Sequence, residues 1–167
     1  MKKQVTLCFT LAMVASSAHA QFEQDKVYVG GGLGLNTPDD GGFDSALGFQ
    51  LFAGYELPFT LDHGINFTAE AGYKYKGDFQ YHYNYNGNNY RSNTFSGDGL
   101  WVGGLGKYPI DDKVDILTRV GYDFGDFDGL HIGGGAEYAV TNRVSLRAEY
   151  VIGSDLNSAQ LNTIYHF

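Results

Sequence analysis

The segment VSLRAEYVI, Val144–Ile152, decides the fold that the sequence predicts. Apolar residues or tyrosine occupy every second position of this segment, and Ser145, Arg147 and Glu149 lie between them. Successive side chains of a β-strand point to opposite faces, so a period of two predicts a strand. One face of this strand is apolar along its whole length, whereas the other face carries two opposite charges.

The same alternation recurs along most of the sequence, and no helical period of about 3.6 residues competes with it. Eight segments show it, each close to the length of about ten residues that a tilted strand needs to cross a bilayer. They are Val27–Leu35, Leu47–Glu56, Ile65–Tyr75, Leu100–Tyr108, Val114–Phe124, Leu130–Val140, Val144–Ile152 and Ser158–Phe167.

The less apolar face of these segments carries more charges than the core of a soluble β-sandwich accepts. These charges are Glu70, Lys74, Arg119, Glu137, Arg147 and Glu149. If the apolar face contacts lipid, the charges can pair with one another inside. Aromatic residues near the segment ends are typical of the interface girdles of membrane barrels. They are Tyr55, Tyr73, Tyr108, Tyr138, Tyr150 and Phe167. The sequence therefore predicts an all-β fold, an eight-stranded antiparallel up-and-down transmembrane β-barrel.

The first twenty residues read MKKQVTLCFTLAMVASSAHA. Two lysines, a short apolar run and the small-x-small triplet that ends at Ala20 predict a secretory signal peptide, cleaved after that residue. Residues 21–167 then form the barrel. The single cysteine, Cys8, lies in the predicted leader, so we expect an exported barrel without disulfides.

The formal net charge is −8, and removal of Lys2 and Lys3 with the leader makes it more negative. A strongly acidic exported chain is a poor candidate for nucleic-acid binding. The mean hydropathy of −0.25 is that of a soluble protein. Alternating apolar and polar residues cancel in such an average, however, so this value does not exclude a membrane barrel.

The stretch FQYHYNYNGNNYR, Phe79–Arg91, also has a period of two, which predicts strand rather than low-complexity loop. We expect the parity of Ile65–Tyr75 to continue unbroken up to the hairpin signal Asn86-Gly87. Pairing across that turn places Tyr73 opposite Leu100, Ala71 opposite Val102, and Trp101 inside the barrel next to Gly72. The predicted surface hairpin comprises Tyr81, Tyr83, Tyr85, Asn86, Gly87 and Tyr90. A disordered Asn/Tyr loop is the alternative, since exposed two-stranded ribbons are marginally stable.

Three stretches resemble the OmpA-like family of small outer-membrane barrels. They are KYPIDDKVDILTRVG, GGGAEYAVTNRVSLRAEY and the terminal TIYHF. The resemblance is clearest from Tyr108 to Tyr150 and at the C-terminus, and the first half matches in pattern more than in letters. Phe167, with Tyr165 two residues before it, resembles the signal that the outer-membrane assembly machinery recognises. The resemblance implies the outer membrane of a Gram-negative bacterium. The family's periplasmic peptidoglycan-binding domain has no counterpart in this sequence, so no cell-wall anchoring is expected.

The resemblance also implies an ion-pair cluster that blocks the lumen. The matching positions are Glu70, Arg119, Glu137 and Arg147. The family's lysine on the fourth strand has no match at the aligned Leu105, and Lys107 on the same face is its candidate replacement. Such pairs either neutralise buried charge or form a switchable gate. The first interpretation is favoured because the interior of a small barrel is normally filled.

Turn lengths predict which of these charges face each other. A three-residue turn, Thr141–Arg143, places Glu137 directly opposite Arg147. A five-residue turn after Tyr108 places Lys107 opposite Asp115, and Arg119 opposite Gly103 and thus near Glu70. We also expect Arg119 near Glu137 diagonally. The predicted cluster is Glu70, Lys107, Asp115, Arg119, Glu137 and Arg147.

Four connections are expected to face the outside: Asn36–Ala46, the Tyr/Asn hairpin, Gly125–Gly129 and Gly153–Leu156. Asp123, Asp126 and Asp128 could offer oxygen ligands to Ca²⁺, but their spacing lacks the EF-hand pattern. We therefore expect a solvated loop, no metal site and no cofactor.

The leading functional hypothesis is a non-enzymatic barrel that supports envelope integrity and presents surface loops. Its expected partners are outer-membrane lipid and lipopolysaccharide, the assembly machinery, and a possible host or surface ligand at the loops. The second hypothesis is a narrow gated, porin-like pore or a small-ligand carrier. The third is a lipid-modifying enzyme, which needs a nucleophile beside a histidine. Only Asp123 and His131 are placed to meet, and no nucleophile is evident beside them, so no catalytic residue is predicted.

Overall fold

The computed structural model describes residues 23–39, 43–80, 82–85, 88–91 and 94–167. For His82–Tyr85 and Asn88–Arg91 only the path of the backbone is described. The predicted leader, Tyr81 and the Asn86-Gly87 turn lie outside the described residues. None of the helices found in the described part of the chain is long and apolar enough to cross a membrane.

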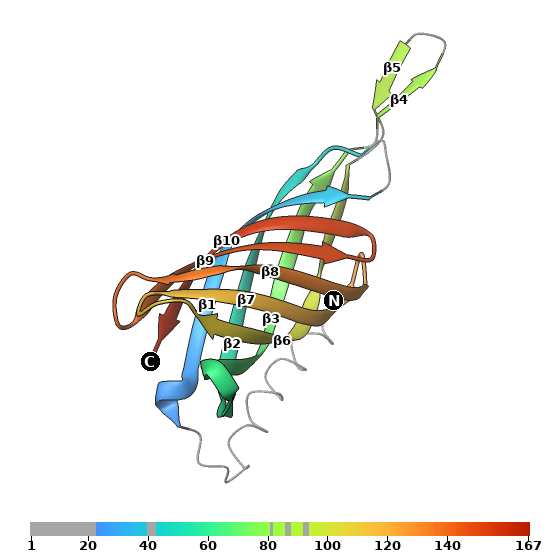
Figure 1. Ribbon diagram of the computed structural model, residues 1–167. Coiled ribbons are helices and arrows are strands. Elements are labelled where there is room, and N and C mark those ends of the chain that lie inside the picture. The colour runs from blue at the N-terminus through green and yellow to red at the C-terminus, as the bar shows by residue number, and fades with distance from the viewer. Residues whose placement is uncertain (1–22, 40–42, 81, 86–87, 92–93) are drawn as a thin grey trace.

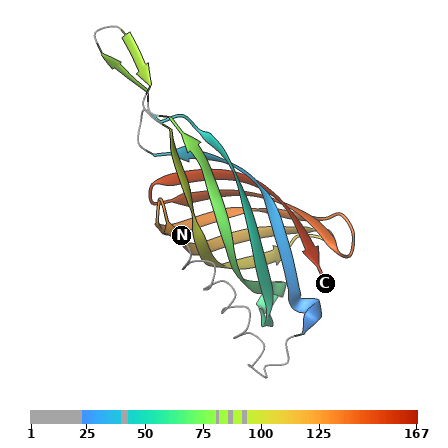
Figure 2. The same ribbon diagram turned by 180° about the vertical axis from the view of Figure 1, so that it is seen from behind.

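The described chain is almost entirely β-structure. The strands are β1 (Val27–Pro38), β2 (Ala46–Leu61), β3 (Ile65–Phe79), β4 (His82–Tyr85), β5 (Asn88–Arg91), β6 (Phe95–Pro109), β7 (Val114–Gly125), β8 (Gly129–Ala139), β9 (Val144–Gly153) and β10 (Leu156–His166). Two 3₁₀ turns, η1 (Gln24–Lys26) and η2 (Asp62–Gly64), precede β1 and β3. Figures 1 and 2 show the long strands tilted around one axis, with β4 and β5 projecting beyond one end.

Eight strands close into an antiparallel barrel in the order β1-β10-β9-β8-β7-β6-β3-β2. Closure confirms the predicted fold class. It also pairs the backbone groups of every barrel strand with two neighbours, which is what a strand surrounded by lipid requires. The strands β4 and β5 form a separate two-stranded sheet. We call the end of the barrel from which they project the hairpin end.

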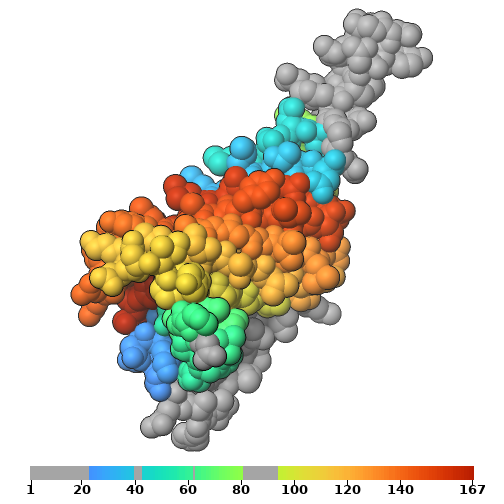
Figure 3. Space-filling view, viewed as in Figure 1, coloured from blue at the N-terminus to red at the C-terminus, as the bar shows by residue number. Residues whose placement is uncertain are grey.

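Apolar side chains are exposed on the outside of the barrel and charged side chains are buried inside it, which is the reverse of the usual distribution in a soluble protein. Leu47 and Leu130 are 64% and 66% exposed on the outer wall, whereas Arg147 inside is 0% exposed. The apolar parity of each strand faces outward, and the charged parity faces a filled lumen. In the space-filling view, the side chains of β7–β10 form a continuous outer wall (Figure 3). An apolar outer wall suits a hydrocarbon surrounding.

Most of the predicted register is confirmed. Tyr73 lies opposite Leu100 and Ala71 opposite Val102 on the β3–β6 ladder. Trp101 lies inside opposite Gly72 and is 1% exposed. Within the projecting hairpin, the backbone pairs His82 with Arg91 and Tyr85 with Asn88, as expected from an Asn-Gly turn.

The expectation of unbroken parity through Phe79 is wrong. The register of β3 against β6 shifts between Tyr75 and Gly77, and Gly77 has a φ of +103°. A β-bulge with glycine in a positive-φ conformation adds one residue to a strand and reverses its parity beyond that point. Phe79 consequently points into the barrel, where it is 0% exposed.

The predicted five-residue turn after Tyr108 is also wrong. The main chain closes at Ile110 and Val114, and the Asp111 carboxylate accepts hydrogen bonds from the backbone N–H groups of Lys113 and Val114 at 2.7 and 2.9 Å. This tighter turn shifts β7 by two residues relative to the prediction. Lys107 therefore lies opposite Leu117 instead of Asp115, and Arg119 lies opposite Leu105 instead of Gly103.

The bulge can be tested with a matched pair of glycine substitutions. A Cβ at Gly77 would lie 2.7 Å from the Cβ of Ala46, in a backbone conformation that L-residues rarely adopt. Gly77→Ala should lower the free energy of unfolding by about 1–3 kcal/mol. Gly104→Ala, whose new Cβ would meet nothing closer than 3.8 Å, is the control and should be nearly neutral. Unfolding in detergent micelles measures both, and equal stability of the two variants would contradict the bulge.

Candidate functional site

The lumen near the end opposite the hairpin holds six charged side chains from five strands. Arg147 on β9 lies at the centre of this cluster. Its Nη1 lies 2.6 Å from a carboxylate oxygen of Glu70, and its Nε donates to Glu137 at 2.9 Å. Glu149, on the same strand, approaches Arg147 to 3.9 Å. Arg147 is thus surrounded by three carboxylates.

Arg119 and Lys107 supply the remaining positive charges. Arg119 donates from Nε to Glu149 and from Nη2 to Glu70, both at 2.8 Å. The ammonium of Lys107 lies 3.3 Å from Glu137. Three cations therefore face three carboxylates, and all six residues are at most 5% exposed. We call Glu70, Lys107, Arg119, Glu137, Arg147 and Glu149 the ion-pair cluster.

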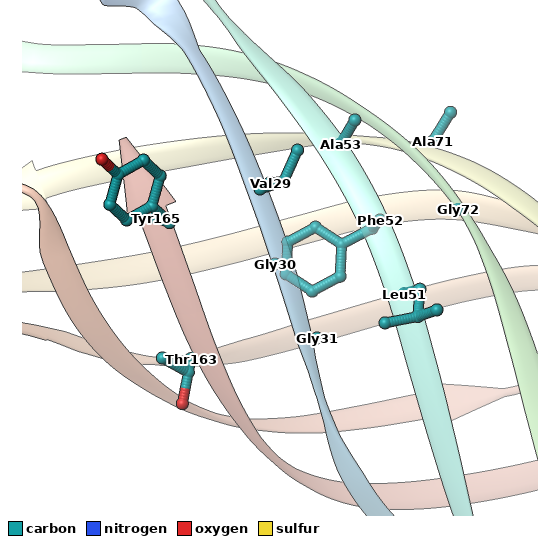
Figure 4. Close-up of a pocket in the computed structure, with 10 residues that line it drawn as sticks. All are labelled: Val29, Gly30, Gly31, Leu51, Phe52, Ala53, Ala71, Gly72, Thr163 and Tyr165. Atoms are coloured by element: carbon teal, nitrogen blue, oxygen red, sulfur yellow. The ribbon is translucent and has the colours of Figure 1, made fainter. Parts of the chain in front are cut away.

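Aromatic side chains fill the space beside the cluster. The Tyr28 hydroxyl donates to Glu70 at 2.5 Å. Its ring occupies the space that a side chain at Gly54 would need, since a Cβ there would lie 2.1 Å from the ring. Figure 4 shows the ring of Phe52 over Gly30 in the same way. Glycines on neighbouring strands thus make room for the large groups that close the lumen.

Cation–π contacts join this aromatic layer to the cluster. The Arg119 guanidinium lies 4.7 Å from the ring centre of Trp101, and that of Arg147 lies 5.6 Å from Phe52. Such contacts gain strength where water is excluded. The arginines are therefore held by both carboxylates and rings.

The structure brings together five of the six cluster residues expected from the sequence. The opposed pair Glu137–Arg147 lies where the Thr141–Arg143 turn placed it. Arg119 does contact Glu70, but its second partner is Glu149 rather than Glu137.

Two expectations for Lys107 and Asp115 are corrected. Lys107 forms its ion pair with Glu137 and not with Asp115, because the tighter turn moves Asp115 to a position opposite Pro109. Two features were missed: Glu149 as a member of the cluster, and Tyr28 as a hydrogen-bond partner of Glu70. Glu149 shares the inward parity of Arg147, so its place in the lumen was predictable, but its partner two strands away was not.

Nearer the hairpin end lies a second polar group around His131. Its Nδ1 lies 3.0 Å from Asp123, whose other carboxylate oxygen is 3.5 Å from the ammonium of Lys74. The opposite ring nitrogen of His131 points toward Gly121, where an added Cβ would lie 2.4 Å from it. The backbone of Gly121 therefore packs against this ring nitrogen.

The weak calcium candidates do not converge. Asp123 lies inside the barrel with His131, and Asp126 accepts a hydrogen bond from the backbone of Asp98 at 3.2 Å. Within the described residues, no group of three or more His, Cys, Asp or Glu side chains is arranged to hold a metal ion.

The predicted assembly residues lie at the outer wall of the end opposite the hairpin. Phe167 is 59% exposed, and its ring lies 5.4 Å from that of Tyr165 in an edge arrangement. Its backbone N–H donates to Val27 at 3.2 Å, which joins the end of the chain to the start of β1.

Comparison with known proteins identifies the family. The model of the outer membrane protein beta-barrel domain matches residues 6–166. The chain belongs to this family. It is therefore an outer-membrane β-barrel protein, in agreement with the OmpA-like resemblance of its sequence.

Several relatives are similar to this chain over nearly the whole length of the chain. Outer membrane protein A of Shigella flexneri is 28% identical over 189 residues, which cover 98% of this chain and 51% of that protein. The Escherichia coli O157:H7 protein of the same name is 26% identical over 180 residues, with 95% and 49% covered. The chain thus spans about half the length of these relatives.

Solved structures share the fold at low identity. A de novo designed transmembrane β-barrel has a TM-score of 0.60 at 19% identity, with 86% of this chain and 96% of the design covered. Ail of Yersinia pestis in a bilayer nanodisc has a TM-score of 0.57 at 12% identity, with 84% and 98% covered. These likenesses show the architecture alone.

The ion-pair cluster predicts non-additive stability changes. Arg147→Ala should lower the free energy of unfolding by about 3–5 kcal/mol, because it leaves a buried excess of negative charge. Adding Glu137→Ala restores the balance of charges, so the double variant should lose less than the sum of the two single changes. Unfolding of all four proteins in one detergent measures the coupling energy.

A surface arginine provides the control for this cycle. Arg143 is exposed in the turn before β9, and Arg143→Ala should change the stability by no more than about 0.5 kcal/mol. Additive losses from Glu137→Ala and Arg147→Ala would contradict the pairing.

Proposed function

We propose that this outer-membrane barrel is non-enzymatic, supports the integrity of the envelope and presents its hairpin-end connections outside the cell. The ion-pair cluster serves as a fixed plug of the lumen. The observation that carries this proposal is the balance of three cations and three carboxylates, all of which are at most 5% exposed inside the barrel. Such a network has no spare charge that could attract an ion into the barrel.

Export and insertion belong to the same proposal. Residues 1–20 act as the cleaved leader, and the outer-membrane assembly machinery of a Gram-negative bacterium recognises Tyr165 and Phe167. The exposure of both rings at one end of the outer wall supports this role, because a recognition signal must be accessible. The apolar outer wall then contacts membrane lipid and lipopolysaccharide.

Deletion of Phe167 tests the assembly role. The loss of this exposed ring should reduce insertion into the outer membrane and increase periplasmic aggregation or degradation. Quantitative immunoblotting of membrane fractions at native expression measures the effect. Phe95→Ala, which also removes an exposed ring but at the hairpin end, is the control and should insert normally. Normal insertion of the truncated chain would refute the role of Phe167.

The hairpin formed by β4 and β5 is the surface element that we propose to meet a host or surface ligand. Its support is geometric, since both strands project beyond the barrel (Figure 1). The predicted tyrosines of this segment are Tyr81, Tyr83, Tyr85 and Tyr90. Tyrosine supplies large contact areas at low entropic cost in recognition surfaces.

A narrow gated pore or small-ligand carrier is the second candidate function. This second function is favoured by further polar side chains in the lumen, on the side of the ion-pair cluster that faces the hairpin end. Gln50 donates to Gln160 at 2.9 Å and to Asn162 at 2.8 Å inside the barrel. A polar lumen can pass or hold solutes if its filling side chains move.

Single-channel recording distinguishes the plug from the pore. Purified protein in planar bilayers should show no steady conductance, because the lumen is filled by paired charges and rings. A large open porin inserted under the same conditions is the positive control. A steady, reproducible conductance of the purified wild-type barrel would replace the plug by the pore as the function.

A further inference from the structure

The connection between β7 and β8 lies over the lumen at the hairpin end. It consists of Asp126, Phe127 and Asp128, which we call the lid segment. Lys76 holds it from below. This lysine is 1% exposed, and its ammonium donates to the main-chain carbonyl oxygens of Asp126 and of Phe127, the latter at 2.9 Å. A charged donor on two carbonyls fixes the path of the backbone rather than one side chain.

The ring of Phe127 extends the contact of the lid segment across the barrel. It packs against a buried cluster formed by Ala46, Phe79 and Leu156, with the Phe79 ring centre 5.3 Å away. These residues lie on β2, β3 and β10, and none of these strands is adjacent to β7 or β8 in the barrel. Phe95 on β6 adds an edge contact at 5.8 Å. The ring therefore links the β7–β8 connection to strands elsewhere in the barrel.

The backbone of the lid segment is under strain that these contacts must offset. Phe127 has a φ of +53°, which is unusual for a bulky side chain. Two hydrogen bonds to β6 fix the neighbouring residue. The Asp126 N–H donates to the Asp98 carbonyl at 3.1 Å, and the Asp98 N–H donates to the Asp126 carboxylate at 3.2 Å. A residue in such a sparsely populated conformation persists only when the surrounding contacts hold it there.

A chamber lies directly below the lid segment. Its lining includes Lys74, Asp123, His131 and Ser158, and its volume is only about 10 Å³. A cavity of this size holds at most about one water molecule. Phe127 of the lid segment also lines this chamber, so movement of the lid segment would open the chamber toward the hairpin end.

From these contacts we infer that the lumen has a second closure, a lid of Asp126–Asp128 that Lys76 and Phe127 hold shut over the chamber around His131. The bulge at Gly77 is what makes it possible, because it turns Phe79 inward to receive the Phe127 ring. The inference deepens the proposed closed lumen and rests on it. The ion-pair cluster closes the end opposite the hairpin, and the lid closes the hairpin end.

Cysteine reactivity tests the lid. Every protein carries Cys8→Ser, so that the introduced thiol is the only one in the chain. Ser158→Cys places a thiol in the chamber, and Ser145→Cys places one in the lumen near the opposite end, where the serine is 5% exposed. Ser45→Cys, at an exposed position, reports unrestricted access. A charged methanethiosulfonate reagent is applied to each protein in nanodiscs.

Two substitutions release the lid in different ways. Lys76→Met removes both hydrogen bonds and keeps the length of the side chain. Phe127→Asn removes the ring and keeps a residue that tolerates positive φ. Each should speed modification at Ser158→Cys by about tenfold or more, because the loss of one hydrogen bond from a charged donor, or of one buried ring, is sufficient to shift an opening equilibrium by that factor. The rates at Ser145→Cys and Ser45→Cys should not change.

The outcomes separate the lid from the plug. Without a lid substitution, rapid modification at Ser158→Cys with slow modification at Ser145→Cys would overturn the lid alone. Rapid modification at both would overturn the closed lumen as a whole. Unchanged rates at Ser158→Cys in both lid variants would contradict the role of Lys76 and Phe127. Equal acceleration at Ser158→Cys and Ser145→Cys would show general loosening of the barrel and would also contradict the lid.

Discussion

A charge inside a narrow barrel must have a partner, and the arrangement of the other lumen residues follows from this constraint. Removing an ion from water costs several kcal/mol even after the protein relaxes, so a lone buried arginine would destabilise the fold. Arg147 is 0% exposed and contacts Glu70 and Glu137, which lie on different strands. The free energy of these pairs depends on the register of each ladder. A slip of two residues would move partners apart by about 7 Å, beyond the reach of an ion pair. The charges therefore specify the register as well as fill the lumen.

The outer wall follows from a second requirement, that backbone groups in lipid pair within the protein. Closure of β1 on β10 meets it for the barrel strands. Once the backbone is paired, a period of two is sufficient to sort the side chains. Apolar residues such as Leu47 and Leu130 face outward, and glycines such as Gly30 and Gly54 leave room inside for rings. The alternation of side chains does not determine the contacts within the lumen or the connections at the hairpin end. The proposed function depends on these two parts.

Much of this architecture could be predicted from the sequence, because local rules determine it. The alternation gave the eight barrel strands, and the Thr141–Arg143 turn gave the pair Glu137–Arg147. The same reasoning failed at the β6–β7 turn, although its chemistry is similar. Asp111 binds the backbone N–H groups of Lys113 and Val114, just as the Thr141 hydroxyl binds those of Arg143 and Val144. Asp111 and Thr141 each supply a side-chain hydrogen-bond acceptor at the start of their turn. This shared feature of the sequence indicates that the two turns have the same length.

Other features needed the three-dimensional structure. The isolated Gly77 within a strand pattern indicates a bulge, but only the observed register shows that Phe79 turns inward. The contact of Arg119 with Glu149 joins strands that are not neighbours. Periodicity places both residues in the lumen without showing which side chains meet across it. The packing of Phe127 against β2, β3 and β10 also joins parts of the barrel that are not neighbours, so periodicity does not predict it either.

The central claim, that the charged parity faces a dry lumen while the apolar parity faces lipid, is tested most directly by the single tryptophan. Trp101 is 1% exposed inside the barrel, and its neighbour Val102 is 46% exposed on the outer wall. The fluorescence of Trp101 should be quenched neither by brominated acyl chains in the bilayer nor by iodide in the water. In a chain carrying Trp101→Phe and Val102→Trp, brominated lipid should quench the emission strongly. Strong quenching of Trp101 by brominated lipid would show that this parity faces the membrane, and quenching by iodide would show a hydrated lumen; either result would contradict the account.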